Sequence, residues 1–147
     1  MIREASSDDI PALMHLESVS FEADRFSRRT FQHLLTRAHG ATLVATDRRR
    51  VRGYATILLR RGTRVARLYS IAVAPGVRRR GLARDLLAAA ERTARRGGAC
   101  CLRLEVRADN TAARALYSRA GYRRLGVTPR YYADGMDAAR LEKPLRS

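Results

Sequence analysis

Apolar and polar residues alternate over three neighbouring stretches in the first half of the chain, which is the pattern of half-buried strands. The alternation predicts strands at Ala41–Thr46, Val51–Leu59 and Val65–Val73. Polar or glycine-containing turns at 48–50 and 61–63 separate them. Because such short turns join strands that run in opposite directions, we expect an antiparallel meander.

Helical spacing dominates the segment ahead of this meander, after a short strand predicted at Ile2–Ala5. The first predicted helix has Pro11 in its first turn, where proline is well tolerated. The second is expected to begin at Ser27, a good N-cap residue, and to end at Gly40.

The pattern changes after the meander, where helices and strands alternate. The spacing predicts helices over Arg80–Arg96 and Asp109–Ala120, and strands at Cys100–Val106, Tyr122–Val127 and Ala138–Lys143. A strand, a helix and a second strand in succession form a crossover that joins parallel strands. The predicted fold class is therefore α/β, in the α+β sense of a mixed, mostly antiparallel sheet. It has one parallel crossover and helices on both faces, in a single domain over residues 1–147.

The junction between the third meander strand and the next helix carries the strongest chemical signal. A helix N-terminus leaves N–H groups unbonded and carries a partial positive charge, which favours phosphate. Gly81 and Ala83 are small enough for an anion to approach the backbone, and Arg78, Arg79 and Arg80 add positive charge. The junction predicts a phosphorylated cofactor, and it lacks both the P-loop and the dinucleotide-binding glycine patterns.

Composition adds a net charge of +16, carried almost entirely by arginine. The arginines are spread along the chain, which fits a solvated surface, docking onto an RNA-rich assembly, or attraction for anionic cofactors. We do not expect a nucleic acid as the substrate. No apolar run approaches the length of a membrane span, and no signal-peptide pattern opens the sequence, so we expect a cytoplasmic protein without a membrane partner. The adjacent Cys100 and Cys101 are expected to be structural, with no metal site.

Two segments resemble the GCN5-related N-acetyltransferases, the GNAT family. The first reads Val73-x-Pro75-x-x-Arg78-Arg79-Arg80-Gly81-Leu82-Ala83-x-x-Leu86-Leu87, and the second Leu104-Glu105-Val106-Arg107-x-x-Asn110-x-x-Ala113-x-x-Leu116-Tyr117-x-x-x-Gly121-Tyr122. With the later Arg130-Tyr131-Tyr132, they are most similar to the RimI-type subgroup, the ribosomal-protein alanine N-acetyltransferases. The resemblance is strong over residues 68–132 and general over residues 1–67.

This resemblance implies acetyl-CoA as the cosubstrate and assigns residues to bind it. Backbone groups of the strand end would pair with the pantetheine arm, and backbone N–H groups of the following turn would hold the pyrophosphate. Asn110 would hydrogen-bond the cofactor. The strand residues are Ile71, Ala72 and Val73, and the turn residues run through Arg79, Arg80, Gly81, Leu82, Ala83 and Arg84.

The resemblance also implies Glu105 as general base and Tyr117 as general acid. Glu105 alternates with apolar neighbours, so its carboxylate should point away from the packed layer and could take a proton from an ammonium group. A tyrosine is a reasonable proton donor to a leaving thiolate of similar basicity. The alternatives are a surface Glu105 paired with Arg103 or Arg107, and a Tyr117 that packs its ring with the hydroxyl at the surface.

The acceptor side is expected to involve Phe26, Ser27, Tyr131 and Tyr132. The chain departs here from the subgroup, since it has no Trp in the segment before Ser27 and no Pro after the tyrosines. At pH 7.5 a neutral α-amine costs about 0.7 kcal/mol and a neutral lysine about 4 kcal/mol, which favours the α-amine of a peptide or protein.

A ribosomal protein or the ribosome is one candidate partner, although two basic proteins repel each other unless an acidic groove compensates. Two alternatives remain open at this point. One is acetylation of a small amine or a lysine side chain, and the other is a basic RNA- or ribosome-binding module with weak or no catalysis.

Overall fold

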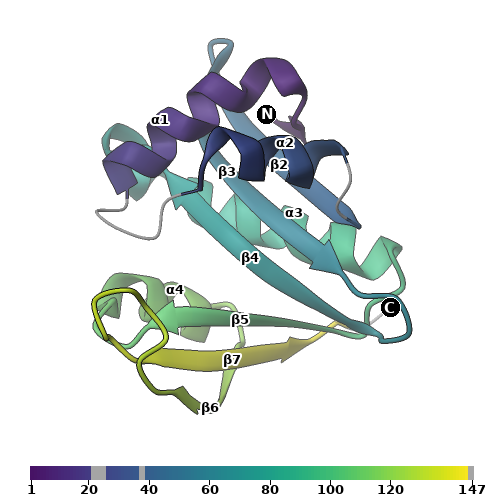
Figure 1. The fold of residues 1–147 in the computed structure, drawn as a ribbon, viewed down its shortest axis with the longest axis vertical. Coiled ribbons are helices and arrows are strands. Elements are labelled where there is room, and N and C mark those ends of the chain that lie inside the picture. The colour runs from purple at the N-terminus through teal and green to yellow at the C-terminus, as the bar shows by residue number, and fades with distance from the viewer. Residues whose placement is uncertain (21–25, 37–38, 146–147) are drawn as a thin grey trace.

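One seven-stranded sheet in the order β1-β2-β3-β4-β5-β7-β6 forms the centre of the described part of the molecule (Figure 1). The computed structural model describes residues 1–20, 26–36 and 39–145, except the side chains of residues 78–80. The strands are β1 (Ile2–Glu4), β2 (Gly40–Asp47), β3 (Arg50–Leu59), β4 (Val65–Val73), β5 (Cys101–Arg107), β6 (Arg123–Thr128) and β7 (Ala138–Pro144). The helices are α1 (Ile10–Ser20), α2 (Arg28–Thr36), α3 (Leu82–Arg96) and α4 (Thr111–Arg119), with short 3-10 helices η1 (Ser7–Asp9) and η2 (Pro75–Arg80).

Strand pairing follows the predicted topology. β2, β3 and β4 form an antiparallel meander, and β4 pairs with β5 in parallel after the α3 crossover. The parallel ladder is short, because it joins only Val65–Arg67 to Cys101–Arg103. Beyond it the two strands separate, as Figure 1 shows. This separation is the feature of the fold on which the site depends.

The two faces of the sheet bury different clusters. On β3, Tyr54 belongs to a cluster with α1 and α2, whereas Ala55 belongs to a larger cluster with α3. Leu86 and Leu87 of α3 are almost fully buried in that larger cluster. The predicted arrangement of helices on both faces is therefore confirmed. No helix of the described residues is long and apolar enough to cross a membrane.

The predicted starts of two helices were wrong, because a glycine and an asparagine set where each helix begins. The helix expected from Arg80 begins at Leu82, since Gly81 takes a left-handed conformation (φ 75°) that separates it from η2. α4 is capped by Asn110 rather than Asp109, because the Asn110 side chain accepts the Ala113 N–H at 3.1 Å.

Gly40 does not end a helix. It opens β2, where a Cβ would overlap the carbonyl of Ile57, so only glycine fits this approach of two strands. The residues just before it, 37–38, lie outside the described part of the chain.

β4 contains a β-bulge at Tyr69. Thr56 of β3 lies opposite Ser70 and the next residue, Ile57, lies opposite Leu68, so Tyr69 is the extra residue. A bulge re-aims the side chains around it, and this one lies just after the point where β4 leaves β5.

Candidate functional site

The opening between β4 and β5 brings together residues from both halves of the sheet. β5 contributes Glu105, and β4 contributes Arg67, the last ladder residue before the strands separate. The Arg67 guanidinium contacts the Oε2 atom of Glu105 through Nε at 3.1 Å and Nη2 at 3.0 Å. Its Nη2 also donates to the Tyr131 hydroxyl at 2.6 Å. One arginine thus connects the carboxylate with the loop between β6 and β7.

Glu105 points away from the α3 side of the sheet, as its alternation predicts. Neither expected ion pair forms, because Arg103 bonds Glu142 at 3.2 Å and Arg107 bonds Asp134 at 2.6 Å. The simple surface pairing considered from sequence was therefore wrong about the partner. The position of Arg67 in the sheet explains why it pairs with Glu105. Arg67 lies at the end of the β4–β5 ladder and reaches across the opening between the two strands.

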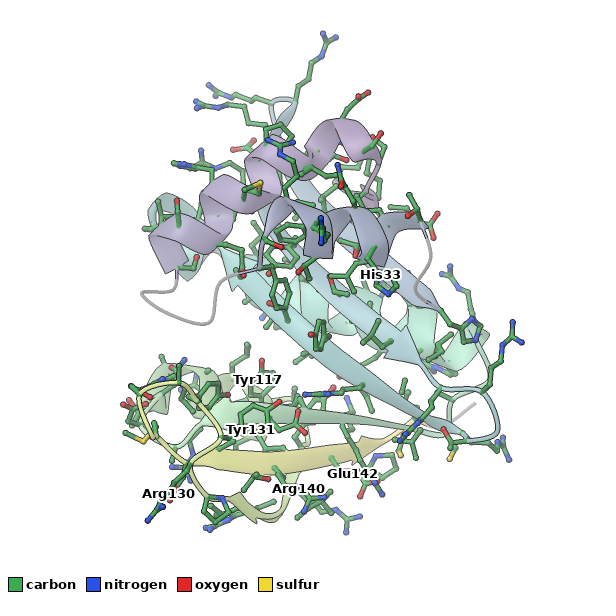
Figure 2. All side chains as sticks on the ribbon, in the orientation of Figure 1. His33, Tyr117, Arg130, Tyr131, Arg140 and Glu142 are labelled. Carbon is green, nitrogen blue, oxygen red and sulfur yellow. The ribbon has the colours of Figure 1, made fainter. Side chains whose placement is uncertain are left out.

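Tyr117 lies beside this cluster on α4, where Figure 2 shows it near Tyr131. Its side chain is buried, with 4% of its surface exposed, and its ring lies edge-on to Tyr122 at 5.6 Å. Burial raises the pKa of Tyr117, and the nearby Tyr132 raises it further. Its hydroxyl makes no hydrogen bond to another described residue. The phenol therefore keeps its proton across the working pH range, and it is a weaker acid than an exposed tyrosine.

The acceptor side is organised by a buried carboxylate that sequence reasoning missed. Glu17 of α1 is 2% exposed, and its Oε1 atom accepts the Phe26 N–H at 2.8 Å. Its Oε2 atom accepts the Tyr54 hydroxyl at 2.7 Å, and that hydroxyl also contacts Ser70 Oγ at 2.7 Å. Glu17 thereby holds the backbone of Phe26, just before α2. A glutamate among apolar helix positions was the only sequence signal for it.

Phe26 connects this network to the opening. Its ring stacks on Tyr69 at 5.1 Å, and the Arg67 guanidinium lies 5.3 Å from the Tyr69 ring centre. Ser27, by contrast, caps α2, since its Oγ accepts the Thr30 N–H at 3.1 Å. The structure thus brings Phe26 to the cluster and gives Ser27 a structural bond.

The helix N-terminus expected to hold phosphate is the first turn of α3. Asp85 N–H is the first to bond into α3, to the Gly81 carbonyl at 3.0 Å, so the N–H groups of 82–84 have no partner within the helix. Gly81, with a positive φ of 75°, makes the turn between η2 and α3. Arg52 of β3 also lies against this loop, with its guanidinium beside Gly76. The buried Nε of Arg52 has no hydrogen-bond partner among the described residues.

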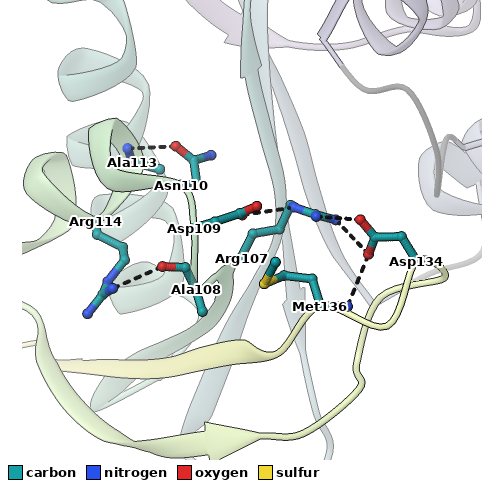
Figure 3. Close-up of polar contacts among 8 residues, drawn as sticks. All are labelled: Arg107, Ala108, Asp109, Asn110, Ala113, Arg114, Asp134 and Met136. Atoms are coloured by element: carbon teal, nitrogen blue, oxygen red, sulfur yellow. Dashed lines mark hydrogen bonds and ion pairs between the residues drawn. The ribbon is translucent and has the colours of Figure 1, made fainter.

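The loop before α4 is held by Arg107, which lies between two carboxylates (Figure 3). It donates to Asp109 Oδ1 at 3.2 Å and in a bidentate manner to Asp134, and its guanidinium lies 5.0 Å from the Tyr132 ring centre. The hydrogen bonds from Arg107 are the main cause that lowers the pKa of Asp134. Arg107 therefore orders the segment that presents Tyr131 and Tyr132. The Asn110 Oδ1 atom accepts the Ala113 N–H, so this side chain has a structural bond in the cap of α4.

The cysteines are both free, with Cys100 exposed just before β5 and Cys101 buried at its start. Burial and the neighbouring Glu142 raise the pKa of Cys101 to about 11, so this thiol stays protonated. Within the described ranges, no three His, Cys, Asp or Glu side chains gather in a way that could hold a metal ion.

Comparison with known proteins adds to this geometry. A sequence profile of the Acetyltransferase (GNAT) family matches residues 10–122. The [ribosomal protein bS18]-alanine N-acetyltransferase of Salmonella typhimurium is 32% identical over 127 residues, covering 86% of this chain and 83% of that protein. The crystal structure of the Escherichia coli ribosomal-protein-S18-alanine N-acetyltransferase superposes with a TM-score of 0.88 at 30% identity, over 100% of this chain and 94% of the other.

Other relatives are longer than this chain. An uncharacterized protein of Mycobacterium leprae is 35% identical over 88% of this chain, which covers 36% of that protein. An N-alpha-acetyltransferase of Saccharolobus solfataricus is 39% identical over 56% of this chain, and the match covers 50% of its length. The chain thus spans a third to a half of the length of these two relatives.

Proposed function

Because the chain belongs to the GNAT acetyltransferase family, we propose that it transfers an acetyl group from acetyl-CoA to the α-amine of a peptide or protein N-terminus. The observation that carries this proposal is the cluster of Arg67, Glu105 and Tyr131 at the opening between β4 and β5, with the buried Tyr117 beside it. The alanine N-acetyltransferase of Salmonella typhimurium, 32% identical, supports an N-terminal acceptor.

The cosubstrate fits the residues that would hold it. The N–H groups of Leu82, Ala83 and Arg84 would bind the pyrophosphate, and Arg52 would add positive charge under the loop. The β4 edge at Ile71 and Ala72, which β5 does not cover, would pair with the pantetheine arm as an added strand does. Acetyl-CoA bound there supplies the activated acetyl group.

Proton movement is assigned to two side chains. Glu105 takes the proton of the acceptor ammonium, directly or through one water, while Arg67 holds the carboxylate in place. Tyr117 donates its phenolic proton to the departing sulfur, and burial keeps that proton available. A backbone N–H near Val73 stabilises the oxyanion.

The acceptor amine sets the demand on Glu105. An α-amine has a pKa near 8 and a lysine amine near 10.4, so the α-amine needs about 3 kcal/mol less to become neutral. The α-amine therefore places the weaker demand on the proposed base. The aromatic side chains Phe26, Tyr69 and Tyr131 would then flank the first acceptor residue.

A pair of matched peptides tests the proposal. One has a free α-amine and only N-acetylated lysines, and the other has a blocked N-terminus and a free lysine. With acetyl-CoA, we expect acetylation of the first peptide and at least about tenfold less of the second, measured by mass spectrometry. Faster acetylation of lysine or of a small amine would replace the proposed acceptor, and acetyl-CoA binding without any product would favour a binding module.

A further inference from the structure

The half of the sheet formed by β5, β7 and β6 has no helix over the face that carries Glu105. Within the described residues, α1 and α2 pack on β2, β3 and β4, whereas Tyr117 of α4 packs into the cluster on the α3 side. Figure 2 labels Arg140 and Glu142 on β7 and Tyr131 in the loop before it. Any chain segment that leaves Glu105 in this direction runs over exposed side chains.

The strand register places a row of charges on this face. Arg140 lies directly opposite Glu105, and Arg103 and Arg123 both lie opposite Glu142, one on each side of β7. Each glutamate already has an arginine, because Glu105 bonds Arg67 and Glu142 bonds Arg103.

Two guanidinium groups remain after this pairing. Arg140 and Arg123 are exposed, and neither lies within 4.0 Å of a carboxylate oxygen of a described residue, although Arg123 faces Glu142 and helps to lower the pKa of that carboxylate. Since directly opposed residues of an antiparallel pair have Cβ atoms about 5 Å apart, Arg140 lies within reach of a group held at Glu105. The bare face next to the proposed base therefore has unbalanced positive charge.

We propose that the preferred acceptors carry Asp or Glu among about their first four residues, which Arg140 and Arg123 bind; this rests on the proposed N-terminal acetylation. An extended peptide advances about 3.3 Å per residue, so residues two to four of an acceptor anchored at Glu105 span β7 and β6. The net charge of +16 attracts acidic acceptors as well. It also repels the basic chains that the subgroup resemblance suggests.

Three peptides that share an N-terminal Ala and differ only at positions two to four test this preference, with Asp-Glu-Asp, Ser-Gln-Ser or Lys-Arg-Lys. At 50 mM salt we expect kcat/KM to be about three- to tenfold higher for the acidic peptide than for the neutral one, and lower still for the basic one. The ratio of kcat/KM between the acidic and the neutral peptide should fall towards one at 500 mM salt, because salt screens the interaction between charges.

Charge reversal separates local contact from the field of the whole molecule. Arg140→Glu should remove or invert the acidic preference. Arg92→Glu changes the net charge equally, but Arg92 is exposed on α3 across the sheet, so the preference should persist.

The outcomes are distinct. Equal rates for the three peptides, a faster basic peptide, or loss of the preference in both variants would overturn Arg140 as the recognition residue while leaving N-terminal acetylation intact. Absence of acetylation on all peptides would overturn the proposed function, and the acceptor preference with it.

Discussion

Arg67 and Glu105 meet across the point where two parallel strands separate. The ladder between β4 and β5 ends at Arg67, and two residues beyond its partner Arg103, Glu105 receives the Arg67 guanidinium at 3.0 and 3.1 Å. Because the same guanidinium binds the Tyr131 hydroxyl and lies over the Tyr69 ring, the carboxylate is held by β4 and by the loop between β6 and β7. Its position therefore depends on the separation of the strands.

Tyr117→Phe should lower kcat at least about 100-fold and leave the affinity for acetyl-CoA within about threefold, because a general acid acts on the rate and not on binding. The unfolding free energy of this variant should hardly change, since the Tyr117 hydroxyl has no hydrogen bond to a described residue. Tyr122→Phe is the matched control. The Tyr122 hydroxyl donates to the buried Glu91 at 2.8 Å, so this variant should lose about 1–2 kcal/mol of unfolding free energy and keep its kcat. Steady-state kinetics and thermal unfolding of both variants check the pair, and an unchanged kcat in Tyr117→Phe would remove Tyr117 from the mechanism.

Gly81→Val should weaken acetyl-CoA binding at least about tenfold, because the left-handed backbone at Gly81 is what exposes the helix N-terminus. Gly62→Val is the control, since Gly62 has a similar φ of 79° with open space around it in the turn between β3 and β4. Both variants should lose stability, and only the first should lose affinity in calorimetric titration. Equal affinities would show that the phosphate site lies elsewhere.

Glu17→Gln should raise the KM for the acceptor more than the KM for acetyl-CoA, because Glu17 holds the backbone of Phe26. It should also cost about 2–4 kcal/mol of unfolding free energy, since it breaks a buried network. Thr56→Val serves as a control on β3, the strand whose Tyr54 bonds Glu17. It removes another buried bond, the 3.0 Å contact between the hydroxyls of Thr42 and Thr56. If both variants change the two KM values alike, Glu17 has only a structural role.

Asp9 gives the fold a measurable dependence on pH. Its pKa lies below the ordinary value, mainly because Arg3 donates two hydrogen bonds to it, at 2.8 and 3.0 Å. A carboxylate whose pKa falls on folding stabilises the protein above its unfolded pKa of about 3.9, and this contribution is lost as the pH drops through the lower folded value. Asp9→Asn should therefore cost about 1–2 kcal/mol at pH 7 and progressively less below pH 4, as measured by urea unfolding. Asp8→Asn, one residue away and exposed, should change the stability by less than about 0.5 kcal/mol at either pH.

Much of the architecture could be predicted because local signals agreed with it. The alternation of β4 gave its bounds without error, and the crossover through α3 gave the parallel pair. The GNAT motifs then predicted the family and its fold, which the family match and the similar crystal structure confirm. Acetyl-CoA as cosubstrate stays a prediction.

The contacts of the site could not be predicted, since they depend on which residues become neighbours across strands. Nothing near Glu105 in the sequence indicates Arg67, and the bulge at Tyr69 shifts the alternation of the residues that follow it in β4. Tertiary pairing decides these positions, and local pattern carries little information about it.

The most direct test of the account is the pH dependence of acetylation of an N-terminal peptide by wild type and Glu105→Gln. If Glu105 takes the proton of the acceptor amine, the variant should be at least about 100-fold slower near pH 7, and its deficit should shrink towards pH 9.5, where the α-amine is already neutral. A deficit of the same size at every pH would contradict the account, and would make Glu105 a residue that positions the acceptor through Arg67.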